Sequence, residues 1–503
     1  MDLLYNSFQF LFIFLPACLL IYFLFARVSG WLASALLMGM SFVFYAWDSA
    51  VIFANHAWQW LGHAPFQMTS TDVQAADSLR NLRVIAVSIV FNFTLGALLR
   101  RRSKGDRFAY AVLCVGVIGN VLALAYFKYA NFLLENYAAL TGHAATHLNI
   151  MLPLGISFFT FTQIAFLVDA YRGKAKELGF FRYGLFVSFF PHLIAGPIVH
   201  HSELMPQFAS KGAKRWNWSN VNIGIAFLSL GLFKKIIIAD ACAPWANQLF
   251  DAVGPFPVEV AWRGAIAYTM QLYFDFSGYS DMAIGLAMLF NIRLPDNFDS
   301  PYKSVSIVDF WRRWHMTLSR FLRDYLYIPL GGNRKGEPRR QVNLILTMLI
   351  GGIWHGAGWT FAVWGLYHGV LLMVNHTWAR TKISLPALIY RPLTFVAVVA
   401  GWVVFRSKDL RTAGSVLRSM AACGPRPTAE FAVDKAALQW QWGVLILLLL
   451  LVNFAPTTKE WVEAKPLGHR RAVLLAVFFF VCLLWMHNAA LTNAPQPFIY
   501  FNF

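Results

Sequence analysis

Long apolar runs dominate this chain and limit what it can fold into. A helix that crosses a bilayer needs about 20 mostly apolar residues, because the hydrocarbon core offers its backbone no water. The runs that approach this length are residues 8–26, 31–47, 82–99, 108–126, 151–168, 221–238, 261–274, 342–354, 360–374, 392–405, 442–455 and 472–486. We therefore predict an all-α polytopic membrane protein with about 11–13 transmembrane helices. The first run is expected to be a retained span, since no basic segment precedes it.

The charged residues fit the same class of protein. Of the 503 residues, 58% are hydrophobic and only 13% are charged, whereas soluble proteins carry about 25%. The formal net charge is +18, and the basic residues lie mainly between apolar runs, as in the cytoplasmic loops of membrane proteins. This distribution predicts how the chain is oriented across the membrane, and it does not indicate a nucleic-acid partner. The basic loops contain Arg100, Arg101, Arg102 and Lys104, then Arg172, Lys174 and Lys176, and finally Arg470 and Arg471. Counting spans from these loops places both termini outside.

A broken apolar segment lies at residues 189–200, FFPHLIAGPIVH. Irregular backbone at membrane depth is tolerated where protein or a water-filled cavity surrounds it. We therefore predict a re-entrant segment here.

The stretch from residue 299 to residue 340 is the most basic part of the chain. Ser306 and Asp309 have capping-box spacing, which predicts that a helix starts there. A continuous helix would place His315 on an apolar face, on the same side as Trp311 and Ser319. The basic residues of this stretch suit phosphate groups, such as those of a coenzyme A thioester. The simpler interpretation is a basic cytoplasmic loop that follows the positive-inside rule. The candidate donor-binding residues are Arg312, Arg313, Arg323, Asn333, Arg334 and Lys335.

His355 ends an apolar run and precedes Gly356, Ala357 and Gly358. Ionisable groups at membrane depth are costly and commonly functional, so His355 is a candidate site residue, the alternative being a buried structural histidine. His368 is better explained as a hydrogen-bonding core residue. No metal is expected, because the histidines lack ligand spacing and the five cysteines are scattered.

A polar sequence, QLYFDFSGYSDMAIG, occupies residues 271–285 within an apolar frame. A nucleophilic serine would usually come with a GxSxG turn, which is absent, so a polar hinge or a cavity lining is the better interpretation. Its candidate lining residues are Asp275, Ser277 and Tyr279.

The motifs together resemble the membrane-bound O-acyltransferase family, in particular the bacterial branch that includes the membrane subunit of alginate O-acetylation. The resemblance covers nearly the whole chain. It rests on SFVFYAW at residue 41, YFKYANF at 126, LPLGISFFTFTQIAFLVDAYRG at 152, FFPHLIAGPIVHHSELMPQF at 189, GLFKKIIIAD at 231, YFDFSGYSDMAIG at 273, DFWRRWHMTLSRFLRDYLYIPLGGNRKG at 309, GGIWHGAGWTFAVWGLYHG at 351, GWVVFR at 401 and FIYFNF at 498.

The resemblance implies one membrane domain over residues 1–503, with a catalytic core at 150–376 and C-terminal helices with an aromatic tail at 390–503. It implies a ring of helices, with re-entrant and interfacial helices, around a central tunnel. The catalytic positions fall on His355 and His315, and His315 or donors near it would steady the thioester oxygen. Trp311, Ser319 and Trp354 would join the tunnel lining. Tyr500 would be an acyl carrier, or else an interfacial anchor.

The expected function is transfer of acetyl from cytoplasmic acetyl-CoA across a bacterial inner membrane, with no bound cofactor. A periplasmic acetyltransferase partner would then place it on an exported polysaccharide, alginate or cellulose. Membrane lipid is the other expected partner. Two alternatives are a channel or exporter subunit without chemistry of its own and a lipid or protein acyltransferase.

Overall fold

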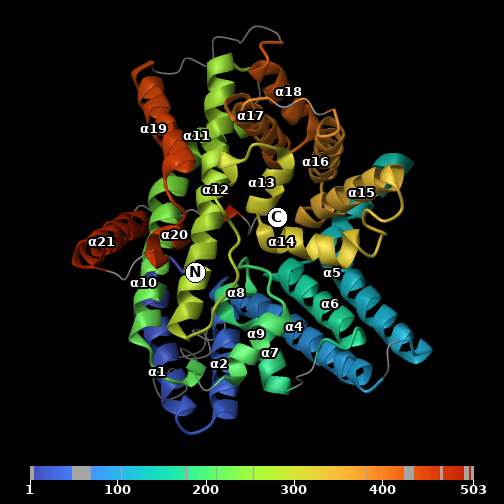
Figure 1. Ribbon diagram of the computed structural model, residues 1–503, viewed down its shortest axis with the longest axis vertical. Coiled ribbons are helices and arrows are strands. Elements are labelled where there is room, and N and C mark those ends of the chain that lie inside the picture. Colours follow the sequence, from blue (N-terminus) through green and yellow to red (C-terminus); the bar gives the residue numbers. More distant parts are fainter. Residues whose placement is uncertain are drawn as a thin grey trace. The chain divides into compact units, whose positions relative to one another are not determined.

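A computed structural model describes residues 5–47, 70–102, 105–144, 146–175, 179–210, 212–252, 254–381, 383, 385–423, 435–464, 468–491 and 498–499. Over these residues all regular secondary structure is helical, as the apolar runs predict (Figure 1). The chain forms two compact units, the first made of Met1–Leu228 with Met282–Pro295 and the second of Ser229–Asp281 with Asp296–Phe503. Helices α10 (Trp218–Leu232) and α12 (Val258–Leu289) contribute residues to both.

The remaining elements of the first unit precede residue 215. They are η1 (Phe10–Phe14), α1 (Leu15–Ala26), α2 (Gly30–Tyr45), α4 (Ser70–Arg100), α5 (Arg107–Thr141), α6 (Ile156–Tyr171), α7 (Phe180–Ser188), α8 (Phe190–Leu193), α9 (His201–Ala209) and η2 (Gly212–Lys214). Those of the second unit are η3 (Phe233–Ala239), α11 (Asp240–Phe250), η4 (Pro301–Lys303), α13 (Ile307–Arg313), α14 (Met316–Leu322), η5 (Arg323–Tyr327), α15 (Glu337–His355), α16 (Trp359–Trp378), α17 (Ala387–Arg406), α18 (Leu410–Met420), α19 (Lys435–Phe454), α20 (Thr458–Glu463) and α21 (His469–Leu491).

Every predicted apolar run coincides with a helix. Six helices of the described chain are long and apolar enough to cross a membrane, namely Ser78–Arg100, Arg107–Thr141, Trp218–Phe250, Ala387–Arg406, Ala436–Phe454 and His469–Ala489. Three shorter apolar helices, Phe10–Ala26, Gly30–Tyr45 and Ile156–Tyr171, match further runs. The total of about 11–13 spans stays a prediction, since helix length and composition alone do not define it.

Polar side chains link the helices of the first unit across an apolar interior. Asn92 of α4 and Asn120 of α5 exchange amide hydrogen bonds of 3.2 and 2.7 Å. Gln163 of α6 donates to Ser88 of α4 at 2.9 Å and accepts from Tyr183 of α7 at 3.2 Å. Such side chains hold membrane helices together, because lipid tails compete poorly for their hydrogen bonds.

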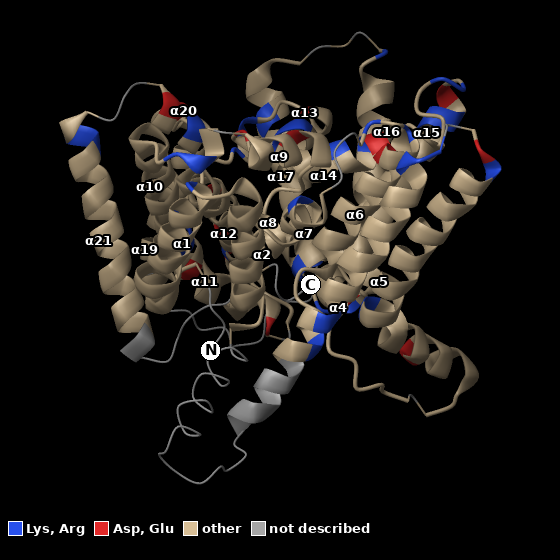
Figure 2. Cartoon of the chain, turned by 90° about the horizontal axis from the view of Figure 1, so that it is seen from below, with Lys and Arg blue, Asp and Glu red and all other residues tan. Residues whose placement is uncertain are grey.

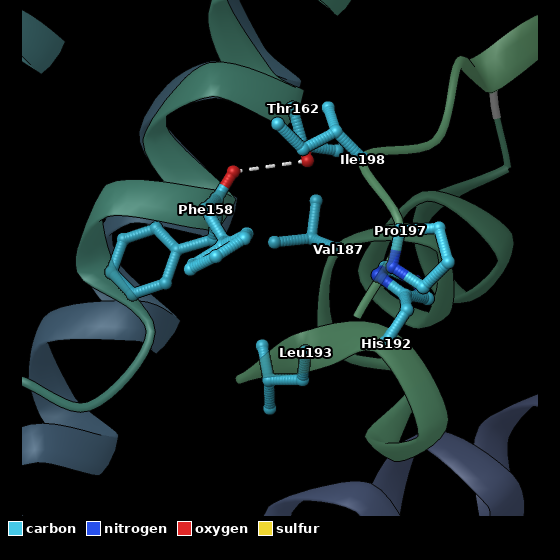
Figure 3. Close-up of a pocket in the computed structure, with 8 residues that line it drawn as sticks. Phe158, Thr162, Val187, His192, Leu193, Pro197 and Ile198 are labelled. Carbon is cyan, nitrogen blue, oxygen red and sulfur yellow. Dashed lines mark hydrogen bonds between the residues drawn. The ribbon is translucent and has the colours of Figure 1, made fainter. Parts of the chain in front are cut away.

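The predicted broken segment is buried in protein. After the four residues of α8, the backbone runs non-helically to His200, and the whole segment is buried. Figure 3 shows a small cavity beside it, with Phe158 and Thr162 of α6 facing His192, Pro197 and Ile198. Surrounding protein is the setting in which non-helical backbone is tolerated at membrane depth.

Close packing of α15 against α16 shapes the second unit (Figure 1). The two helices meet at glycines: a Cβ on Gly365 would lie 2.5 Å from the backbone oxygen of Met348 and 3.1 Å from the Cα of Gly352. Small residues at a helix interface let the backbones approach closely. The pair then packs on an aromatic core that also includes residues of α12, α13 and α17.

We expect Gly365→Ala to destabilise the protein by about 1–3 kcal/mol, because the added methyl has no space against rigid backbone. Thermal unfolding of the purified protein in detergent measures this. The matched control is Gly443→Ala in α19, where a Cβ meets nothing within 4 Å. An equal melting temperature for the two variants would contradict the close packing.

Candidate active site

His315 lies at a break between two helices. α13 begins as predicted, with the Ser306 hydroxyl accepting from the Asp309 backbone N–H at 3.1 Å. The expected continuous helix is wrong, because α13 ends at Arg313 and His315 adopts left-handed backbone angles, φ 43° and ψ 53°. A non-glycine residue in this conformation costs about 1–2 kcal/mol, and such strain is concentrated at functional sites.

The segment before α13 holds this break open. The backbone N–H of Met316 donates to the backbone oxygen of Asn297 at 3.0 Å, and that of Asp299 donates to the backbone oxygen of Arg313 at 3.0 Å. These partners come from outside the helix and replace the bonds that a continuous helix would have made.

Asn297 also fixes the protonation of the His315 ring. The Asn297 side-chain oxygen accepts from the backbone N–H of Thr317 at 3.4 Å and from the Thr317 hydroxyl at 2.9 Å, and it lies 3.0 Å from His315 Nδ1. A backbone N–H can only donate, so the Asn297 atom facing His315 is the oxygen. His315 Nδ1 must therefore carry hydrogen, which puts the lone pair of the neutral ring on Nε2.

Burial keeps that ring neutral. His315 is 0% exposed, and Phe276 of α12 contacts its ring edge to face with centroids 4.8 Å apart. Loss of hydration lowers the pKa of His315 from 6.5 to about 3. A neutral ring whose Nε2 is an acceptor cannot donate to a thioester oxygen from that atom. This protonation favours hydrogen-bond donors near His315 over the ring itself as the groups that steady the oxygen, and that role stays a prediction.

His355 is the last residue of α15 and is 5% exposed. Its ring contacts Trp354, Trp364 of α16 and Phe405 of α17, with centroids 4.9, 5.3 and 5.3 Å apart. Gly356 next to it fits closely, since a Cβ there would lie 2.1 Å from the ring of Phe361. The helix end, the glycine and the aromatic contacts together set the position of this histidine.

Both candidate histidines contact one aromatic core. Phe276 beside His315 and Trp364 beside His355 belong to the same buried cluster. Trp311, which we expected near the site, joins it with its ring centroid 5.7 Å from that of Trp364. Its indole N–H donates to His368 Nδ1 at 3.3 Å, so His368 is a buried hydrogen-bonding residue, as predicted.

The basic stretch of the second unit lies at one end of its helices. Figure 2 shows Lys and Arg gathered around α13, α15 and α20. Arg313 is paired with Asp299 at 3.1 Å and with Asp309 at 3.0 Å, so α13 already uses part of its charge. Arg323 pairs with Asp324 at 2.7 Å. The other candidate donor-binding residues are exposed: Arg312, Asn333, Arg334 and Lys335.

The polar residues of α12 are buried, and they differ in their contacts. Asp275 forms an ion pair with Lys235 of η3 at 2.6 Å, a partner that the sequence interpretation missed. Ser277 is 2% exposed, and among the described residues its hydroxyl has no hydrogen-bond partner. Tyr279 packs edge to face on Phe498 with centroids 4.7 Å apart. The tunnel that these residues, Trp354 and half-buried Ser319 are expected to line stays a prediction.

Asn297 and Lys235 are the main residues that sequence reasoning overlooked. Lys235 stands in an apolar run, GLFKKIIIAD, and an ionisable residue there is a signal for a site. Asn297 gives no comparable signal, because its role depends on folding against His315.

Comparison with known proteins identifies the class. The model of the membrane-bound O-acyltransferase family matches residues 23–388. The chain is 45% identical to a peptidoglycan O-acetyltransferase of Helicobacter pylori over 68% of this chain and 70% of that protein. It is 38% identical to a probable alginate O-acetylase, AlgI, of Azotobacter vinelandii over 92% and 87%, and 37% identical to that of Pseudomonas aeruginosa over 90% and 81%.

The chain belongs to the membrane-bound O-acyltransferase family. It is a multi-pass membrane O-acyltransferase, and the reading as a channel without chemistry of its own is therefore set aside.

We expect Asn297→Leu to lower acyl transfer at least about tenfold, because His315 loses the acceptor that fixes its tautomer and orientation. Asn297→Asp keeps acceptor oxygens but adds a negative charge, which raises the pKa of His315. This variant should keep partial activity, and its acidic limb should move to higher pH. Rates of acyl transfer measured from pH 5 to pH 9 separate the loss of the acceptor in Asn297→Leu from the raised pKa of His315 in Asn297→Asp. Identical profiles for Asn297→Asp and the parent would contradict this role.

Proposed function

We propose that this enzyme takes acetyl from acetyl-CoA on the cytoplasmic side of a bacterial inner membrane and passes it outward for O-acetylation of an exported polysaccharide. The observation that supports this most is the placement of His315 and His355, each at a helix break, on one buried aromatic core. The names of the relatives support acetyl as the group and a surface polymer as the destination.

The proposed chemistry divides the work between the histidines. His355 takes the proton from the attacking hydroxyl, whose oxygen bonds to the thioester carbonyl carbon. The carbon–sulfur bond then breaks, and the proton passes from His355 to the departing thiolate. A pKa near 3 makes His315 a poor base, so its Nε2 lone pair instead accepts a hydrogen bond and orients the hydroxyl.

The donor is proposed to bind at the basic end of the second unit. The exposed side chains of Arg312, Arg334 and Lys335 suit the phosphates of coenzyme A. Basic ends of membrane helices face the cytoplasm, where this donor is found. By the same rule, we propose that both termini lie on the periplasmic side.

The acceptor is proposed to be a carrier that hands acetyl to a periplasmic acetyltransferase partner. Tyr500, in the aromatic segment FIYFNF, is our candidate carrier and lies outside the described residues. Its phenol has an ordinary pKa of about 10, so it needs a base near neutral pH, and His355 supplies one.

Alginate and cellulose are the polymers that we propose first. Peptidoglycan is a second candidate, favoured by the 45% identity to the Helicobacter pylori protein. Membrane vesicles given labelled acetyl-CoA, the partner and each polymer in turn distinguish these acceptors.

We expect His355→Ala to lower transfer from labelled acetyl-CoA about 10²- to 10⁴-fold, the usual contribution of a general base. Donor binding should be unchanged, because the substituted side chain does not contact the phosphates in this proposal. The control is His147→Ala, an exposed histidine of the first unit. Undiminished transfer by a folded His355→Ala protein would remove this residue from the mechanism.

We expect Tyr500→Phe to abolish polymer acetylation and to leave acetyl-CoA binding intact, because only the carrier oxygen is lost. Tyr137→Phe, at an exposed tyrosine of α5, is the matched control. Acetylation by the Tyr500→Phe protein at the parental level would make Tyr500 an interfacial anchor.

A further inference from the structure

A buried ion cluster lies in the second unit and includes neither of the two histidines. Lys235 Nζ of η3 is 2.6 Å from Asp275 of α12 and 2.8 Å from Asp240 of α11. The side chains of Lys235 and Asp275 are 1% and 3% exposed. Charges buried this deeply are costly to desolvate, and replacing such a pair with apolar residues commonly costs nothing. A gain in folding stability is therefore a weak explanation for the presence of these buried ion pairs.

The cluster binds the aromatic segment that ends the sequence. The backbone N–H of Ile499 donates to the Asp275 carboxylate at 3.0 Å. The Phe498 ring covers Lys235 with the ammonium 4.8 Å from its centroid, and it also packs on the ring of Tyr279. Phe498 and Ile499 are 1% and 8% exposed, so these two residues are buried in the protein.

The local backbone builds a socket for this segment. Asp275 and Tyr279 are four residues apart, so they share one face of α12. That face lies close to η3 at Gly278, where a Cβ would be 2.8 Å from the Gly231 oxygen and 3.1 Å from the Lys235 nitrogen. η3 is a π-helical stretch, a distortion that is frequent at functional sites.

A neighbouring ion pair joins the same two elements through different residues. Lys234 Nζ lies 2.7 Å from Asp281 and 2.7 Å from the Thr458 hydroxyl at the start of α20. Thr458 in turn donates to Asp281 at 2.6 Å. The two adjacent lysines therefore have different partners, and only Lys235 contacts Phe498.

We propose that Lys235, Asp275 and Tyr279 form a binding socket for the chain's own segment at Phe498–Ile499. The carboxylate binds the backbone N–H, and the ammonium and the phenol ring bind the aromatic side chain. We assign the socket residues a positioning role toward the proposed carrier Tyr500, which follows Ile499 in sequence, and this role rests on the proposed function. Docking is a property of the protein and does not depend on which acyl group it transfers.

The test measures how accessible the docked segment is. A thiol is placed by Ile499→Cys, which keeps the backbone N–H, in a full-length chain whose own five cysteines are replaced by alanine. N-ethylmaleimide labelling is followed in detergent. We expect the double substitution Lys235→Met with Asp275→Leu to speed labelling at least about tenfold, because the hydrogen bond to a charged acceptor is lost.

The control is Lys234→Met with Asp281→Leu, which removes an ion pair between the same elements. It should change labelling less than about twofold, because the contacts of Phe498 and Ile499 with Lys235, Asp275 and Tyr279 stay in place. Equal labelling rates for the two double variants would overturn the socket. If the socket variant does not fold, Phe498→Leu in the same probe protein carries the test: it removes the cation–π contact and should also speed labelling, and an unchanged rate would overturn the proposal.

This readout is separate from the proposed acetyl transfer, since labelling needs no acyl donor. Tyr500→Phe in the probe protein should leave the thiol protected while polymer acetylation is lost. A protected thiol without acetyl transfer in the parent would refute the proposed function and leave the socket standing.

Discussion

Several polar side chains of this protein are buried among its helices, where partners must come from the protein itself. An unsatisfied polar group in such surroundings costs several kcal/mol. That is a large part of the free energy of unfolding of a typical protein. The apolar runs make the helices, but the polar partners decide where the helices break and which of them touch. Examples are Asn92 with Asn120, Asn297 with His315, and Lys235 with Asp275.

The pairing of Asn297 with His315 shows how structure and chemistry are joined. The same asparagine holds the backbone break, through its carbonyl, and sets the tautomer of the ring, through its side chain. Burial against Phe276 then keeps the ring neutral. His315 is thus suited to accept a hydrogen bond, and in the proposed mechanism proton transfer is assigned to His355 at the end of α15. The two histidines therefore have different surroundings, and the proposed mechanism gives them different roles for that reason.

Sequence reasoning located the helices well and the site in part. The apolar runs, the start of α13 at Ser306 and the glycine-rich break after His355 all follow from local pattern, and the structure agrees. The continuous helix through His315 was wrong, because its backbone bonds go to residues 297 and 299 instead of to its own preceding turn. Asp275 was expected to line a cavity, yet it pairs with Lys235, forty residues earlier in the chain, a partner that helical periodicity does not reveal.

The sequence by itself determined the class of protein, the helices and the candidate catalytic histidines, because hydrophobic length, helix caps and motifs are local properties that each segment carries alone. Only the tertiary structure decided the strained backbone of His315, the tautomer of its ring and the socket around Phe498. Each of these depends on groups that are distant in sequence and meet only after folding. The physical reason is the same in all three: a buried hydrogen bond or charge is satisfied by whichever partner the packing of helices brings within reach.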